Sequence, residues 1–532
     1  SFANMMEYVA IDAIEPDWHI WETFQTSEAP AALQRDATDG VQSVHVQVED
    51  PAEIDSLFDS AIVYAKGARM LVMVRALIGD DALRKGLKQY FEAHQYGNAA
   101  GADLWQALGD ASGIDLGTLM KLWLEQPGYP VVTAAVVDGQ LTLAQRQFFI
   151  GDGHDANRQW QIPLNSNYDA APQILADERV TLGDYAELRQ AAGKPFRLNV
   201  GNNSHFIVKY DQTLLDDILA DTENLDAISQ LQTLQDLRLL AEGRQISYAA
   251  VVPLLARFAN SGSTVVNVAL YRVAGDLKRF VDPDSEAERQ LKALYDQLSQ
   301  AEVKRLGWTA NVDDAIDDQL SRPVVLNAAL YAENAGTILA AHELFEGQAG
   351  QWVSLPADVR ILILRNEVQH FGNTALFETL LKAYRQTSDA SYKADICTAL
   401  TSTTDAKLIA ELITAFEDAD TVKPQDLRAW YRGVLANAKG QQAAWDWIRQ
   451  DWAWLEATVG GDMEFTTFIT VTAAIFHTPE RLAEFKEFFE PKIPTPGLGR
   501  EIKMDTKVIE SRVALVEDEK AAVNAAEQQL VQ

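Results

Sequence analysis

The chain has 532 residues, a hydrophobic fraction of 47% and a formal net charge of −32. A chain of this length exceeds what one hydrophobic core supports, so we expect a globular protein of about three domains. The acidic balance argues against nucleic acid and anionic membrane as partners, because both require basic surface. No apolar run approaches the roughly 18 residues of a membrane-spanning helix.

Helices are predicted over residues 1–129. Apolar residues recur at three- and four-residue spacing from Phe2 to Ala13, which indicates one helix face. Further helices are predicted over residues 54–79, over 82–94 with Asp80 and Asp81 as caps, over 102–113 with a stop at Gly113, and up to Pro127.

The sequence pattern changes from helical to β-type after residue 129. Two β-rich runs flank Asp138-Gly139, a strong signal for a tight hairpin. Residues 160–167 and 195–200 are further strand candidates, so we predict a small all-β unit of the sandwich type over residues 130–208. From residue 209 to 532, amphipathic segments separated by short turns predict a long helical array of the curved-solenoid kind, without a strict repeat.

One short motif has the appearance of a metal site. His342-Glu343-Leu344-Phe345-Glu346 begins like a zincin helix, but that helix needs a second His where Glu346 stands. We therefore interpret the segment as a surface helix. None of the eight histidines pairs with another at three- or four-residue spacing, so the sequence predicts no zinc site in this chain. It also contains no nucleophile elbow, phosphate-binding loop or dinucleotide fingerprint.

The single cysteine, Cys397, rules out a disulfide framework and a multi-cysteine zinc site. It lies in an apolar helical stretch, which indicates a buried, inert thiol; a reactive nucleophile is the alternative interpretation. Sparse cysteine is typical of a reducing compartment and predicts a cytoplasmic location.

Three local patterns occur along the chain: SFANMMEYVAIDAIEPDW at its start, then PAEIDSLFDSAIVYAKGARMLVMV, then LWLEQPGYPVV. Together they resemble the aminopeptidase N family of zinc aminopeptidases, the gluzincins, and its bacterial members most. The first pattern is similar to the helix that follows the third zinc ligand of that family. PAEIDSLFDSAIVYAKGARMLVMV resembles the downstream helix with its Tyr-x-Lys-Gly string, and LWLEQPGYPVV resembles the junction between the catalytic domain and a β-sandwich. The three patterns occur in family order, and the resemblance covers essentially the whole chain.

The resemblance implies a multidomain, mostly α-helical fold. Residues 1–129 would be the C-terminal helical part of a thermolysin-like catalytic domain, residues 130–208 a β-sandwich, and residues 209–532 an α-helical superhelix of the HEAT/armadillo-like kind. Some strings depart from the family pattern. Residues 204–210 lack the Arg that the family carries there, and Gln230 stands six residues before Asp236 where an Arg is common. We carry no role over to these positions.

The resemblance also implies a chemistry. Tyr64 matches the family tyrosine whose hydroxyl donates to the oxyanion of the reaction intermediate; the alternative is an ordinary packing residue. Asn4 and Glu7 are candidates for orienting a zinc-bound His, against plain surface or packing roles. The zinc ligands and the general base would lie upstream of Ser1, so we expect zinc in the intact enzyme and none in this chain.

The leading hypothesis is that the chain is the C-terminal portion of a zinc-dependent aminopeptidase that removes N-terminal residues from peptides, inactive without the missing N-terminal part of the same polypeptide. The alternative is a non-catalytic helical-solenoid binding scaffold, and a third hypothesis is a degenerate family member without zinc. The scaffold hypothesis predicts no metalloprotease motif upstream, whereas the leading hypothesis requires one.

Overall fold

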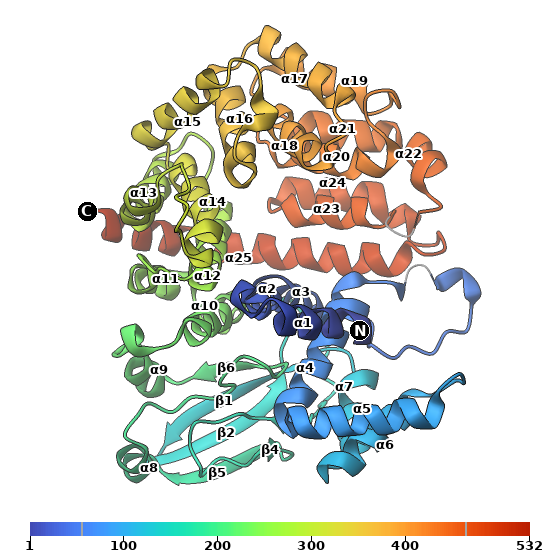
Figure 1. The fold of residues 1–532 in the computed structure, drawn as a ribbon, viewed down its shortest axis with the longest axis vertical. Coiled ribbons are helices and arrows are strands. Elements are labelled where there is room, and N and C mark those ends of the chain that lie inside the picture. The colour runs from blue at the N-terminus through green and yellow to red at the C-terminus, as the bar shows by residue number, and fades with distance from the viewer. Residues whose placement is uncertain (55–56, 463–464) are drawn as a thin grey trace. The chain divides into compact units, whose positions relative to one another are not determined.

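The computed structural model describes residues 1–532 except residues 55–56 and 463–464 (Figure 1). The chain folds into two compact units, Ser1–Ser247 and Tyr248–Gln532. Each unit has its own cluster of buried apolar side chains. In the first unit one continuous core joins the N-terminal helices to the sheet, because buried residues of both belong to the same cluster. The domain boundaries at residues 129/130 and 208/209 stay predictions.

The first unit begins with a series of helices. They are α1 (Phe2–Ile14), η1 (Pro16–Trp18), α2 (Ile20–Thr23), η2 (Phe24–Glu28), α3 (Ala29–Asp36), η3 (Pro51–Glu53), η5 (Ser60–Lys66), α4 (Gly67–Ile78), α5 (Asp80–His94), α6 (Gly101–Ser112) and α7 (Leu116–Glu125). Of these, α1, η5 and α5 pack against α4. The elements η2 and η5 are π-helical turns. The predicted stops are confirmed at Gly113, which closes α6 in the left-handed conformation, and at Pro127, which follows the end of α7.

The helix predicted over residues 54–79 was wrong at its start. Its residues 55–56 lie outside the described part of the chain, and the regular structure begins at Ser60, where the Asp59 carboxylate accepts a hydrogen bond from the Ala61 amide. The first turns are π-helical, and α-helix follows only from Gly67. The capping prediction also needs correction, because Asp80 and Asp81 lie inside the first turn of α5.

The sheet of the first unit has strand order β5-β2-β1-β6. The hairpin prediction is confirmed: β1 (Pro130–Val137) and β2 (Gln140–Gln147) pair antiparallel, and Asp138 and Gly139 turn the chain with φ of 50° and 82°. β6 (Ile207–Tyr210) lies parallel to β1. The remaining elements are β3 (Ile162–Pro163) paired with β4 (Ile174–Leu175), β5 (Arg179–Asp184), α8 (Tyr185–Ala192), α9 (Gln212–Leu219), η6 (Thr222–Asn224) and α10 (Ala227–Glu242).

The strand expected at residues 195–200 is absent from the described structure. The segment instead runs beside residues 164–167, where the Asn199 amide donates to the Leu164 carbonyl at 2.7 Å and the Asn167 amide donates to the Arg197 carbonyl at 3.1 Å. Asn199 and Asn202 have φ of 52° and 53°, a left-handed conformation that interrupts extended backbone. These turns end the pairing before a strand can form.

The second unit is helical throughout its described residues. Its helices of eight or more residues are α12 (Thr264–Leu277), α13 (Glu286–Leu306), α14 (Ile316–Tyr331), α15 (Ala335–Gly347), α16 (Ala357–Phe371), α17 (Thr374–Gln386), α18 (Ala390–Thr401), α19 (Ala406–Ala415), α20 (Leu427–Ala436), α21 (Gln441–Gln450), α22 (Trp452–Val459), α23 (Thr467–Ile475), α24 (Pro479–Phe489) and α25 (Gly499–Val531). The shorter α11 (Tyr248–Val251) is followed by the 3-10 turns η7 (Val252–Phe258), η8 (Lys278–Phe280), η9 (Trp352–Ser354), η10 (Pro424–Asp426) and η11 (Glu490–Lys492). Cys397 is buried on α18, as predicted.

The helices of this unit pack in a regular manner. Neighbours in sequence pair, as α13 does with α14, α15 with α16 and α17 with α18. Alternate helices also pack side by side and form a row, α12, α14, α16, α18, α20, α23 and α25. The long α25 contacts α23 and α24 and, further along, α13, α11 and η8 (Figure 1). The last helix thus contacts both the final helices of the row and the first helices of the unit.

No single helix among the described residues is long and apolar enough to cross a membrane. By length and composition alone, one pair of helices passes the test together, Ile316–Tyr331 with Ala335–Gly347, and the two are bent by 117°.

Candidate functional site

Tyr64 lies on the exposed side of the π-helical turn η5. Its side chain is 48% exposed, whereas Ile62, Ala65 and Lys66 of the same turn are buried. Short π-helical segments occur frequently at functional sites, since the extra residue in the turn re-aims a side chain. Among the residues that the structure describes, the Tyr64 hydroxyl makes no hydrogen bond. Its phenol is therefore available to donate to a bound molecule.

The start of α1 packs directly against this turn. The Ser1 hydroxyl donates to the Val63 carbonyl at 2.6 Å. Gly67 permits the close approach, because a Cβ atom at this position would lie 2.0 Å from the Ser1 Oγ. The first residues of the chain and Tyr64 are thus brought together from positions more than 60 residues apart.

Asn4 and Glu7 have different surroundings. The Asn4 side-chain amide donates to the Glu28 carboxylate of η2 at 3.4 Å, and the Tyr8 hydroxyl lies 3.5 Å from the other oxygen of the same carboxylate. Glu7 is exposed. The structure therefore joins Asn4 to a carboxylate, Glu28, that the sequence did not single out. The roles of Asn4 and Glu7 toward a zinc-bound His stay predictions.

Behind the Tyr64 turn lies a buried ion network centred on Asp36. The Lys66 ammonium is 2.8 Å from Asp36 Oδ2, and the His205 Nε2 donates to the same oxygen at 2.9 Å. The Gly128 amide donates to Oδ1 at 3.0 Å. The side chains of Asp36, Lys66 and His205 are 0% exposed. The network joins α3, the Tyr64 turn, the segment before β1 and the segment before β6.

The protonation states in this network follow from burial and charge. Burial alone would raise the pKa of Asp36, but the Lys66 ammonium and the hydrogen bond from His205 hold it below its usual value. Burial lowers the pKa of His205 to about 4, against the opposing pull of Asp36. His205 is therefore neutral at pH 7, with the proton on the Nε2 that donates to Asp36. Its buried Nδ1, the acceptor nitrogen of this tautomer, has no hydrogen-bond partner among the described atoms.

A second buried contact fastens α4 to the segment before β6. The Arg69 guanidinium is 0% exposed and donates to the carbonyls of Asn202 at 3.2 Å and Ser204 at 2.9 Å. Nearby, burial raises the pKa of Asp236 to about 7, while this carboxylate accepts the Val208 amide at 3.1 Å. The segment that contains Tyr64 and the following helix α4 therefore make buried polar contacts on their inner side. No sequence motif indicated the residues that form these contacts.

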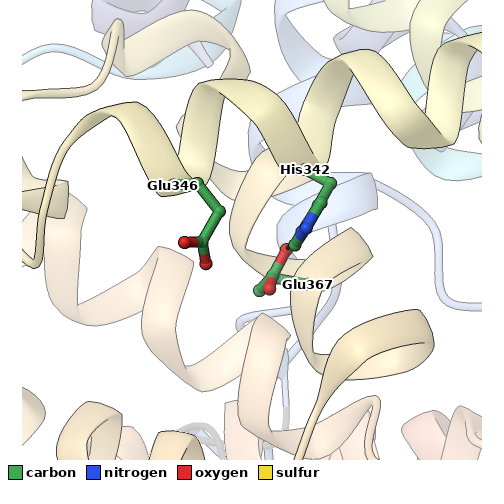
Figure 2. Close-up of side chains that lie close together, drawn as sticks. All are labelled: His342, Glu346 and Glu367. Atoms are coloured by element: carbon green, nitrogen blue, oxygen red, sulfur yellow. Dashed lines mark hydrogen bonds and ion pairs between the residues drawn. The ribbon is translucent and has the colours of Figure 1, made fainter.

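The segment 342–346 lies on α15, as the helix prediction required. The structure adds a partner from the next helix, because the His342 Nδ1 is 2.8 Å from the Glu367 carboxylate of α16 (Figure 2). Among the described residues, His342, Glu346 and Glu367 are the one group of three metal-binding side chains that come close together. Within that same part of the chain, no such group surrounds Tyr64.

Two family models match this chain. Residues 1–123 match the family model described as the Peptidase family M1 domain, and residues 196–511 match the ERAP1-like C-terminal domain. The Tyr64 turn lies inside the region that matches the peptidase-domain model. The chain is also similar over nearly its whole length to bacterial enzymes called aminopeptidase N, and it belongs to the aminopeptidase N family.

Individual relatives show how much of their length the chain covers. The chain is 62% identical to aminopeptidase N of Lactobacillus helveticus and 57% identical to that of Lactobacillus delbrueckii subsp. lactis, in each case over 99% of this chain and 62% of the relative. It is 28% identical to aminopeptidase M1 of Arabidopsis thaliana, over 98% of this chain and 61% of the relative. The chain therefore spans somewhat less than two thirds of the length of the curated relatives it matches.

Proposed function

We propose that this chain is part of a zinc-dependent aminopeptidase that removes N-terminal residues from peptides, and that Tyr64 donates a hydrogen bond to the oxyanion formed at the scissile carbonyl. The observation that carries the proposal is the exposed Tyr64 hydroxyl on a π-helical turn that lies against the start of α1. A phenol keeps its proton at neutral pH, so it has a donor to offer to a developing negative charge.

The described residues do not fit a zinc site at Tyr64. A zinc centre in proteins needs at least three His, Cys, Asp or Glu side chains, and among the described residues the one such group lies on α15 and α16. We therefore propose that the zinc ligands and the general base lie outside these 532 residues. The chain by itself would then hydrolyse no peptide, and its contribution to the reaction is confined to what Tyr64 and its supports do.

The supports of Tyr64 are positioning residues in this proposal. The Lys66 ammonium, two residues after Tyr64, is fixed on Asp36, and Gly67 sets the distance to α1. Because the turn is held from its buried side, the backbone that carries Tyr64 is fixed in position. A donor that is fixed in advance stabilises an oxyanion more than a mobile one, since less reorganisation accompanies the reaction.

Several finer points belong to the same proposal. The row of alternate helices in the second unit supports an α-helical superhelix, and α25 would complete its closure. Asn4 is proposed to act through Glu28 rather than on its own, since the two side chains are joined. The single cysteine supports a cytoplasmic location. The match to a peptidase domain over residues 1–123 argues against the scaffold hypothesis.

The test compares the 532-residue chain with a protein extended at its N-terminus to the length of the relatives. Aminoacyl-anilide hydrolysis and zinc content are measured for both, and turnover is expected in the extended protein alone. In the extended protein, Tyr64→Phe should lower kcat roughly 10²- to 10³-fold with zinc content unchanged. Tyr96→Phe is the matched control, because Tyr96 is also an exposed tyrosine of the first unit. An unchanged kcat in Tyr64→Phe would remove Tyr64 from the reaction.

A further inference from the structure

Three potential metal ligands meet between two helices of the second unit. His342 and Glu346 lie one turn apart on α15, and Glu367 projects toward them from α16 (Figure 2). One nitrogen or oxygen atom from each lies within 4.8 Å of the other two. Residues four apart on a helix share one face, so the two ligands of α15 are directed to the same side.

Glu367 is the residue that needs a compensating charge. Its side chain is 4% exposed, and its carboxylate lies against the His342 ring (Figure 2). A buried carboxylate is costly unless it is paired with a cation or neutralised. Among the described residues its ion-pair partner is His342, and neither a lysine nor an arginine forms an ion pair with it. Glu346 adds a second carboxylate to the group. The group thus contains two carboxylates and an imidazole, and no lysine or arginine of the described residues forms an ion pair with Glu367.

The His342 ring is already oriented for ligation. It stacks on Phe371 of α16, with 3.9 Å between ring centroids and 17° between planes. With the ring in this orientation, the Nδ1 atom lies 2.8 Å from the Glu367 carboxylate, at hydrogen-bond distance, so a proton lies between the two atoms. A bound metal would replace that proton, since metal ligands must be deprotonated. The ring would therefore need no new rotamer.

The remaining movement falls on the most mobile ligand. Metal–nitrogen and metal–oxygen bonds of about 2.0–2.2 Å place tetrahedral ligand atoms about 3.4 Å apart. The present separations are at most 4.8 Å, so a ligand atom must move by up to roughly 1.4 Å. Glu346 is exposed and can supply this shift by rotating its side chain. His342 and Glu367 are thus already adjacent, and Glu346 can complete the coordination of the ion by rotating its side chain.

We propose that His342, Glu346 and Glu367 bind one divalent transition-metal ion, with Zn²⁺ as the best fit, and that the ion fastens α15 to α16. One imidazole with two carboxylates suits borderline ions, whereas Mg²⁺ and Ca²⁺ prefer oxygen ligands alone. Three protein ligands leave a position for water. The proposal departs from the expectation that this chain holds no metal. It does not depend on the peptidase proposal, because it concerns the second unit and a binding equilibrium.

The experiment uses the metal alone and the 532-residue chain. The chain is freed of metal with a chelator and titrated calorimetrically with ZnCl₂, and thermal unfolding is followed with and without Zn²⁺. We expect one Zn²⁺ per chain and a higher Tm with the ion, and MgCl₂ should produce neither effect. His342→Gln and Glu346→Gln should each weaken binding more than about tenfold and abolish the Tm increase. Because Glu346 is exposed, its substitution leaves the fold intact.

Glu343→Gln is the matched control. Glu343 is an exposed carboxylate on the same helix, so its substitution makes the same change in charge without removing a ligand of the group. The control should bind Zn²⁺ like the unaltered chain. Absence of stoichiometric binding would overturn the proposal. So would equal weakening by Glu343→Gln and Glu346→Gln, because the ion would then be attracted only by the acidic surface.

Discussion

Removal of the Lys66 ammonium tests whether the buried network holds the Tyr64 turn. Lys66 and Asp36 are joined at 2.8 Å, and both side chains are 0% exposed. In Lys66→Met, Asp36 keeps its hydrogen bonds from His205 and Gly128 and loses its cation. Loss of one partner of a buried ion pair costs about 3–5 kcal/mol, because the other charge is left uncompensated. For a unit of this size, that loss corresponds to a Tm lowered by roughly 10 °C.

The assay is differential scanning calorimetry of the 532-residue chain and its variants at pH 7. Arg84→Met is the matched control, since Arg84 and Asp81 are also joined at 2.8 Å but both side chains are exposed; this variant should leave the Tm unchanged. Lys66→Met combined with Asp36→Asn should recover part of the loss, because the amide oxygen still accepts from Gly128 and carries no charge. Equal Tm values for Lys66→Met and Arg84→Met would refute the assignment of a structural role to the buried pair.

Two further predictions concern buried titratable groups of the second unit. Glu527 is fully buried, neither of its carboxylate oxygens has a hydrogen-bond partner among the described atoms, and burial raises its pKa to about 8. The folded state therefore keeps a proton on Glu527 that the unfolded chain releases near pH 4.5. Because of this difference, the free energy of unfolding is highest in acid and falls as the pH rises from 4.5 to about 8. Glu527→Gln should gain a few kcal/mol relative to the original chain between pH 5 and pH 8, measured as a growing difference in Tm; a difference independent of pH would contradict this. Burial also raises the pKa of the Cys397 thiol, so a thiol reagent should label Cys397 in the native chain far more slowly than in urea, and equal rates would show the thiol to be accessible.

Local signals in the sequence predicted local structure well. Asp138-Gly139 determined the hairpin because a tight turn of this kind needs two residues with positive φ, and Gly113 and Pro127 marked helix ends for equally local reasons. The start of the helix bearing Tyr64 was placed too early. An apolar pattern does not distinguish a π-helical turn from an α-helical one. The pattern also does not reveal that the helix is capped at Asp59, whose carboxylate accepts a hydrogen bond from the Ala61 amide.

The partners of the candidate site were beyond sequence reasoning, because they are distant in the chain. Asp36 and His205 are 169 residues apart, and each stands in a segment without a recognisable motif. The group of His342, Glu346 and Glu367 was also not predicted from the sequence. A zincin motif requires both histidines on one helix, whereas the third member here, Glu367, comes from the next helix 25 residues later. Spacing along one helix does not reveal such a group.

The placement of α25 has a consequence for how the second unit is made. This helix is the last of the unit to leave the ribosome, yet it packs against α11 and α13 at the beginning of the unit. Contacts of such long sequence separation form slowly, because the intervening chain must first be ordered. The earlier helices can stack on one another as they emerge, but their apolar edges remain exposed until α25 has been made. Folding of the unit therefore ends only after its last helix is released, and a chain interrupted before residue 499 would be left open and prone to aggregate.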